Sequence, residues 1–248
     1  MIKGIYFGLG FFWHSKERTI LEISERMICL FQDLASMDVR FSAPHYSSRK
    51  GQNIKIDIAS SDGVRALAES LKISLESDIL EHDGTTKPNL SFKREFGFSA
   101  SFEFKDQDIS LSGRLGSSKA EGLSFSFSGN FEESSDWYLQ LLKTCIVNTS
   151  SFFGSMQLKI AKVTKQINDI KYPIGIITYY ADNLSLNIGG CLEGLEVIQE
   201  DAGFYVVLSH ESITDSKEFF DGFKRDLILV NQKLRQCDAM ILRELPPG

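Results

Sequence analysis

Histidines and their acidic neighbours are the residues of this chain that could most readily do acid–base or metal chemistry. The run Glu81-His82-Asp83 could bind a metal ion or act as a general base. Adjacent side chains in a turn diverge, however, so we interpret this run as solvated surface residues. The histidines themselves are scattered singly, at His14, His45, His82 and His210. This pattern predicts no catalytic residue and no metal site.

The loop motifs of nucleotide-binding and hydrolytic enzymes are absent from the sequence. Gly8-Leu9-Gly10 lies between a predicted strand and a predicted helix, but Trp13 occupies the place of the third glycine of a dinucleotide-binding loop. There is no Gly-x-x-x-x-Gly-Lys-Ser/Thr loop, no Gly-x-Ser-x-Gly elbow and no His-Glu-x-x-His pair. We therefore expect a protein that is not an enzyme and has no cofactor. The alternative is an enzyme acting on a small molecule, with a site assembled from distant segments.

The cysteines and the apolar segments indicate a cytoplasmic protein. Cys29, Cys145, Cys191 and Cys237 are too widely spaced for a Cys-x-x-Cys zinc or redox site. Cys29 and Cys145 have apolar neighbours in predicted helices, so we expect buried, reduced thiols. The longest apolar run, from Gly4 to Trp13, is far shorter than the roughly 20 residues that a membrane-spanning helix needs. We expect no contact with a membrane.

Negative charge is concentrated in two parts of the sequence. The net charge of -6 and the pI of about 5.3 argue against direct binding of nucleic acid. Residues 172–216 contain no Lys or Arg, so we predict that their carboxylates attract a basic partner. A predicted loop over residues 76–89 is the second candidate. The alternative is an acidic face that only aids solubility. The candidate partner-binding residues are Glu193, Glu196, Glu200 and Asp201 in the first stretch, and Glu76, Asp78, Glu81 and Asp83 in the second.

Helices are predicted where apolar residues recur at every third or fourth position. The clearest begins after Ser15, the predicted N-cap. Further helices are predicted over residues 61–75, 134–148 and 215–234. The apolar stripe of the first helix consists of Ile20, Ile23, Met27, Leu30, Phe31 and Leu34.

Strands are predicted where apolar and polar residues alternate. Residues 96–104, 109–115 and 123–131 predict an antiparallel meander with an aromatic inner face and a serine-rich outer face. Other predicted strands are 2–13, 174–180, and a hairpin of 195–199 with 204–209; residues 42–53 are a predicted loop, and 156–169 fit a strand or a helix. We expect one α+β domain over residues 1–248, with a mixed, largely antiparallel sheet packed with about four helices.

Three blocks of the sequence resemble a known bacterial family. The first is Tyr6-Phe7-Gly8 through Gly10-Phe11-Phe12-Trp13, with Lys16-Glu17 and a helix ending Leu34-Ala35-x-x-Asp38-x-x-Phe41. The second is Ile174-Gly175-Ile176-Ile177-Thr178-Tyr179, and the third is Gly203-Phe204-Tyr205-Val206-Val207-Leu208-Ser209 before the last helix. Over roughly residues 4–236 the chain resembles the immunity protein 52 family of bacterial polymorphic toxin systems.

This resemblance implies a cytoplasmic α+β protein, without catalysis, that binds and neutralises a cognate toxin encoded beside it. The neighbouring toxin in this family typically carries a nuclease domain of the restriction-endonuclease type. Such a nuclease presents a basic cleft to DNA, which agrees with the acidic candidate residues. The resemblance assigns no role to individual positions, and the oligomeric state is open. A general scaffold protein of the cytoplasm, with no toxin partner, is a further alternative.

Overall fold

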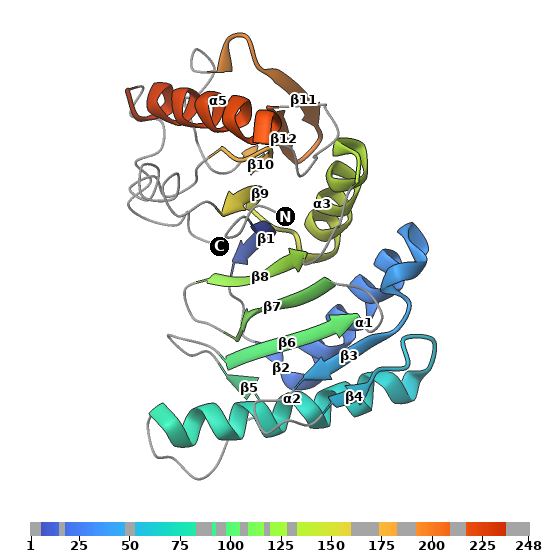
Figure 1. The fold of residues 1–248 in the computed structure, drawn as a ribbon. Coiled ribbons are helices and arrows are strands. Elements are labelled where there is room, and N and C mark those ends of the chain that lie inside the picture. Colours follow the sequence, from blue (N-terminus) through green and yellow to red (C-terminus); the bar gives the residue numbers. More distant parts are fainter. Residues whose placement is uncertain are drawn as a thin grey trace. The chain divides into compact units, whose positions relative to one another are not determined.

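The fold consists of four α-helices and twelve β-strands within the residues that the structure describes (Figure 1). All strand pairs whose register is defined are antiparallel. The expected α+β class is therefore confirmed. This computed structural model describes residues 6–14, 18–47, 53–82, 91–92, 98–104, 109–116, 120–127, 133–159, 174–182, 192–208 and 217–236.

The chain folds into two compact units whose segments alternate along the sequence. One, here called the hairpin unit, consists of Met1–Phe11, Phe127–Lys143 and Ser151–Pro247. The other, the meander unit, consists of Phe12–Ser126 and Thr144–Ser150. Strand β1 (Tyr6–His14) and helix α3 (Ser135–Thr149) contribute residues to both units. The single domain over residues 1–248 stays a prediction.

The meander unit has the strand order β8-β7-β6-β3-β4. Strands β6 and β7 pair from Phe98↔Leu115 to Phe104↔Ile109, as the alternating pattern predicted. Its strands are β2 (Arg18–Thr19), β3 (Pro44–Ser47), β4 (Asn53–Lys55), β5 (Ser91–Phe92), β6 (Phe98–Phe104), β7 (Ile109–Leu115) and β8 (Ala120–Phe127). Its helices are α1 (Ile20–Met37), the 3-10 turn Val39–Phe41 and α2 (Ser61–His82).

Aromatic rings from α1 and the strands form the core of the meander unit. The Phe31 ring lies edge-on to Phe102 and Phe104, with centroid distances of 5.0 and 6.0 Å. The Phe41 ring lies 5.1 Å from Phe104 and 5.8 Å from Phe125. All five side chains are buried. Each such pair contributes about 0.5–1.5 kcal/mol beyond the burial of apolar area, so this face of the strands is structural.

Helix α1 begins at Ile20, so the predicted N-cap at Ser15 is wrong. Thr19 caps the helix: its Oγ1 accepts a hydrogen bond from the Glu22 N–H at 3.2 Å, and Glu22 Oε2 accepts one from the Thr19 N–H at 2.5 Å. This reciprocal capping box satisfies two main-chain donors at once. The predicted apolar stripe is buried. Cys29 is exposed between buried positions of α1, so only Cys145 of the two helical thiols is buried as expected.

Two segments predicted as loops belong to regular structure. Helix α2 continues through residues 76–82, because this segment contains good helix formers and the Asp83-Gly84 turn signal comes only after it. Residues 44–47 of the predicted loop 42–53 form β3, which pairs with β6 through Tyr46↔Phe102. Burial of Tyr46 against the aromatic core overrides the polar character of its neighbours.

The hairpin unit has the strand order β11-β12-β10-β9-β1. The predicted hairpin is confirmed, because β11 and β12 pair from Glu196↔Val207 to Glu200↔Gly203. Of residues 156–169, which fitted a strand or a helix, residues 156–159 belong to a strand. Residues 160–169 lie outside the described residues. The strands are β9 (Phe153–Lys159), β10 (Ile177–Ala181), β11 (Glu196–Glu200) and β12 (Gly203–Val207), and the last helix is α5 (Lys217–Gln236).

Asn231 attaches α5 to the chain just before β10. Its fully buried side chain accepts a hydrogen bond from the Ile174 N–H at 2.9 Å and donates to the Ile174 carbonyl at 2.9 Å. It also donates to the Leu227 carbonyl within its own helix at 2.8 Å. One side chain therefore satisfies both main-chain groups of a buried residue, as a neighbouring strand would.

Replacing Asn231 with leucine should lower the free energy of unfolding by about 2–4 kcal/mol, because the Ile174 N–H and carbonyl would be buried without partners. Gln232→Ala, on the exposed side of the same helix, should change it by less than about 0.5 kcal/mol. Urea unfolding followed by circular dichroism measures both. Equal midpoints for the two variants would contradict this role of Asn231.

Candidate partner-binding site

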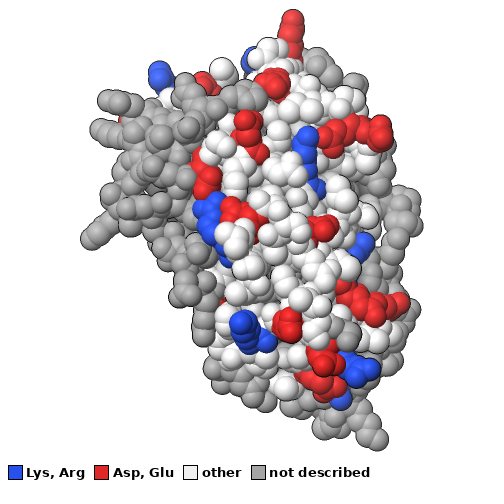
Figure 2. Space-filling view, turned by 90° about the vertical axis from the view of Figure 1, so that its right-hand side faces the viewer, with Lys and Arg blue, Asp and Glu red and all other residues white. Residues whose placement is uncertain are grey.

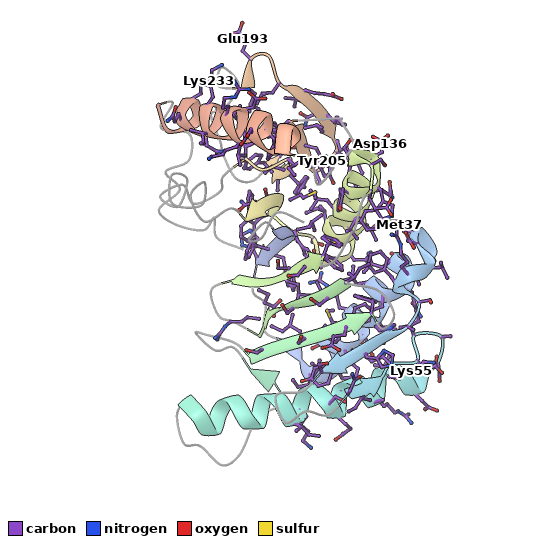
Figure 3. The ribbon with its side chains drawn as sticks, in the orientation of Figure 1. Met37, Lys55, Asp136, Glu193, Tyr205 and Lys233 are labelled. Carbon is purple, nitrogen blue, oxygen red and sulfur yellow. The ribbon has the colours of Figure 1, made fainter. Side chains whose placement is uncertain are left out.

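The first group of predicted site residues lies together on the β11–β12 hairpin. Glu193 lies in the turn before β11, and Glu196 and Glu200 are the first and last residues of that strand. Asp201 is the first residue of the turn into β12. All four side chains are exposed, and Glu193 projects away from the hairpin in Figure 3. We call these four residues the acidic hairpin.

The second group of predicted residues does not form the expected loop. Glu76, Asp78 and Glu81 lie in the C-terminal part of helix α2, in the meander unit, and Asp83 lies outside the described residues. The prediction placed these carboxylates on a loop because it ended the helix too early. The acidic hairpin is therefore the group whose four members all lie within the described residues, and its role as the binding site stays a prediction.

A tight turn builds the hairpin. Asp201 and Ala202 form the turn, and Gly203 begins β12. A Cβ atom at Gly203 would lie 2.2 Å from the Tyr180 carbonyl oxygen, so a larger residue would push β12 away from β10. Glycine at this position lets the acidic turn lie close to the end of β10, where Ala181 pairs with Gly203.

One lysine binds the inner end of the acidic hairpin. The Lys143 Nζ, from α3, lies 2.5 Å from Glu200 Oε1 and 5.3 Å from the centroid of the Tyr205 ring. This lysine therefore neutralises part of the charge of Glu200. Figure 3 shows Tyr205 on the strand next to α3. Sequence reasoning missed Lys143, and its one signal was the excess of lysine over carboxylates in residues 137–171.

Tyr179 lies beside the turn into β12. Its hydroxyl donates a hydrogen bond to the Ala202 carbonyl at 3.0 Å. Burial, and after it the charges of Asp182 and Glu200, together raise the pKa of Tyr179 from 10.0 to about 12. The two carboxylates therefore add a smaller contribution to a shift that burial dominates.

Further Asp and Glu residues are scattered over the side of the molecule that carries α3 and β11. Figure 2 looks onto the side that carries α3 and β11, and red Asp and Glu atoms outnumber blue atoms over the upper part of that face. Asp182, just after β10, adds a further exposed carboxylate next to the turn. Such a surface attracts a cationic partner and raises its association rate.

A buried carboxylate in the meander unit was missed by sequence reasoning. Glu121 is 1% exposed; its Oε1 accepts a hydrogen bond from the Gly116 N–H at 2.9 Å, and its Oε2 accepts one from the Trp13 indole N–H. With Arg26 it lines a small cavity that has room for about one water molecule. The signal was its position, because Glu121 is in phase with the inward-facing Leu123. We interpret Glu121 as structural, since the cavity has no room for a substrate.

The described residues offer little for metal chemistry. Within them, no three His, Cys, Asp or Glu side chains are grouped so that they could hold a metal ion. His45 is buried, with its Nδ1 3.0 Å from the Ala43 carbonyl oxygen. His82 lies at the end of α2, and Asp83 beside it is outside the described part of the chain. No helix of that part is both long enough and apolar enough to cross a membrane.

Comparison with known proteins gives a likeness of fold and no family. No protein-family model matches the chain, and no curated protein matches it. Among solved structures, the chain is similar to the "Pseudomonas aeruginosa T6SS protein PA0821", with a TM-score of 0.50 and 9% sequence identity. The likeness covers 93% of this chain and 72% of that chain. At this identity the likeness concerns the fold.

Glu200→Gln should lower the pKa of Tyr179, because it removes one of the two charges that raise it. Glu193→Gln makes the same charge change farther along the hairpin and should leave that pKa nearly unchanged. Because the folded-state pKa is raised, the neutral phenol stabilises the fold below about pH 10, and this contribution is lost as the pH rises toward 12. Carbon-13 NMR titration of the tyrosine ring measures both variants. Equal titration midpoints would contradict the assigned cause.

Glu121→Leu should lower the free energy of unfolding by about 1–3 kcal/mol, because the Trp13 and Gly116 N–H groups would lose their acceptor. Glu103→Gln, at an exposed position of β6, is the matched control and should change it by less than about 0.5 kcal/mol. Tryptophan fluorescence during urea unfolding follows the transition. A Glu121→Leu variant as stable as the control would show that the buried carboxylate is dispensable.

Proposed function

We propose that this chain is a cytoplasmic immunity protein, without catalysis, that binds and neutralises a cognate toxin. The toxin is a nuclease domain of the restriction-endonuclease type, encoded beside the gene for this chain. The acidic hairpin carries this proposal: four exposed carboxylates lie on one strand and its adjoining turns, within a stretch that contains no Lys or Arg. The protein acts by occupying a basic surface of the toxin.

The fold and the sequence resemblance support the same proposal. The fold is like that of a T6SS protein, a secretion-system context in which an immunity function is expected. Two of the blocks that resemble the immunity protein 52 family lie on adjacent strands, because β10 pairs with β12 from Ile177↔Val207 to Ala181↔Gly203. The resembling segments therefore form the part of the hairpin unit on which the acidic hairpin is built.

Electrostatics gives the proposed inhibition its physical basis. A nuclease needs a basic cleft because its substrate is a polyanion. Carboxylates fixed on a protein scaffold compete with phosphates for that cleft, or bind beside it, and long-range attraction raises the association rate. Lys143 contacts both Glu200 and the Tyr205 ring, so it fixes the position of Glu200 at the end of β11.

The direct test is calorimetric titration of this protein into the nuclease domain encoded by the adjacent gene, with a DNA-cleavage assay on the same samples. We expect tight 1:1 binding and loss of cleavage. Absence of binding together with undiminished cleavage would overturn the proposed function, and would favour the enzyme or the scaffold alternative. Rescue of bacterial growth when both genes are expressed together supplies the cellular readout.

Reversing Glu193, Glu196 and Asp201 to lysine should lower the association rate constant about 10- to 100-fold at low salt, with a smaller effect at high salt. The control reverses Glu25, Glu69 and Glu103, which are exposed in the meander unit and give the same change in net charge. Stopped-flow measurement of association with the nuclease domain compares the two triple variants. Equal slowing by both would mean that net charge alone matters and that the acidic hairpin is not the binding surface.

A further inference from the structure

The register of the hairpin determines which main-chain groups of β11 are available to a partner. Along an antiparallel strand, successive residues direct their N–H and C=O alternately toward the two neighbouring strands. The Leu208 N–H donates to the Ile176 carbonyl at 2.8 Å, and the Asp182 N–H donates to the Ala202 carbonyl at 3.1 Å. The N–H and C=O groups of the even-numbered residues from 202 to 208 therefore point toward β10.

The N–H and C=O groups of the odd-numbered residues of β12 consequently point toward β11. Their partners in the register are Glu196, Ile198 and Glu200. Val197 and Gln199 alternate with these partners, so their N–H and C=O groups point away from β12. Among the described residues β11 pairs with no other strand, and both Val197 and Gln199 are exposed. The outer edge of β11 thus offers two complete sets of main-chain donors and acceptors.

Strands β4 and β11, at the two ends of the described strand order, each pair with a single neighbouring strand, and they differ in how their outer edges are protected from further pairing. Edge strands are usually kept from pairing by being very short, by charged side chains (especially lysine), by proline or by a bulge. At one end, β4 has three residues and terminates in Lys55. At the other, β11 has five residues that pair one-to-one with β12, and it contains neither lysine nor proline. Its charged residues, Glu196 and Glu200, are both negative, so β11 is an edge that repels an acidic strand and can accept a basic one.

The side chains of β11 specify what kind of strand fits. Glu196, Ile198 and Glu200 share one face, because side chains alternate along a strand. Opposite these positions, an incoming strand gains most from a basic, an apolar and a second basic residue. A second copy of this chain is disfavoured at the same edge, since it would bring glutamate close to glutamate.

We propose that β11 binds an extended basic segment of the partner protein by strand addition, through the main-chain groups of Val197 and Gln199 and the carboxylates of Glu196 and Glu200. The identity of that partner as the toxin rests on the proposed function. The recognised segment alternates basic and apolar residues on the face that meets β11. Main-chain bonds supply affinity in this mode, and the carboxylates supply the preference for basic sequences.

Proline substitution tests the main-chain part of the proposal. Val197→Pro removes an outward-facing N–H and leaves every bond to β12 in place, which edge strands tolerate. We expect it to weaken binding of the adjacent-gene nuclease domain about tenfold relative to Val197→Ala, which keeps the N–H. Gln199→Pro against Gln199→Ala is the second pair, and far-ultraviolet circular dichroism establishes that all four variants are folded.

A synthetic peptide makes the outcome independent of the toxin. The probe peptide carries lysine, valine and lysine at every second position, with threonine at the positions between them. Its control has glutamate in place of both lysines. We expect the lysine peptide to perturb the amide NMR signals of Val197 and Gln199, and the glutamate peptide to leave them unchanged. Glu196→Gln should weaken the binding of the lysine peptide to β11.

Each result separates the inference from the proposed function. If the nuclease domain binds the wild type and both proline variants as tightly as their alanine counterparts, strand addition is wrong and the proposed function stands. If the nuclease domain fails to bind but the lysine peptide binds at β11, the proposed function is wrong and the binding edge stands. Failure of both probes, equal binding of the two peptides, or dimerisation through β11 would overturn the inference.

Discussion

The requirement that every buried main-chain N–H and C=O be paired determines the arrangement of the hairpin unit. Strand β12 satisfies it on both sides, with β10 through one set of residues and with β11 through the other. Asn231 satisfies it for Ile174 by means of a side chain. Strand β11 is different, because its outward groups are exposed and need no partner from the described residues. The same rule that makes β12 structural thus leaves β11 suited to binding.

Charge and strand geometry act on one site. The carboxylates of the acidic hairpin provide attraction at long range, and Lys143 neutralises part of the charge at one end. The edge of β11 provides main-chain bonds at short range and fixes the register of whatever binds. An acidic surface alone would attract any basic molecule, and a bare strand edge would risk aggregation. Together they favour an extended basic segment over other partners and over a second copy of the chain.

Much of the fold could be predicted because alternation and helical spacing are local properties of a sequence. The Phe/Ser alternation predicted β6 and β8, and the alternation of aliphatic and polar residues predicted β7. The Asp201-Ala202-Gly203 turn predicted the hairpin that carries the candidate residues. Errors arose where tertiary contacts override local character. Tyr46 makes β3 a strand by packing against Phe102. The early end predicted for α2 was instead a local error, because residues 76–82 contain good helix formers and the turn signal comes only after them.

The candidate site could be predicted only in part. The absence of Lys and Arg from residues 172–216 identified the acidic hairpin, because charge composition can be counted in a sequence. The contacts of Lys143 with Glu200 and Tyr205 could not be predicted, because they join residues distant in the sequence. The direction of the β11 main-chain groups depends on the register with β12 and β10, which the sequence does not specify.

Amide hydrogen exchange on the chain, free and bound to the nuclease domain encoded beside it, tests the central claim most directly. The account predicts that exchange at Val197 and Gln199 slows on binding, while exchange along β4 stays the same. Slowed exchange elsewhere in the chain, with Val197 and Gln199 unaffected in a saturated complex, would contradict it.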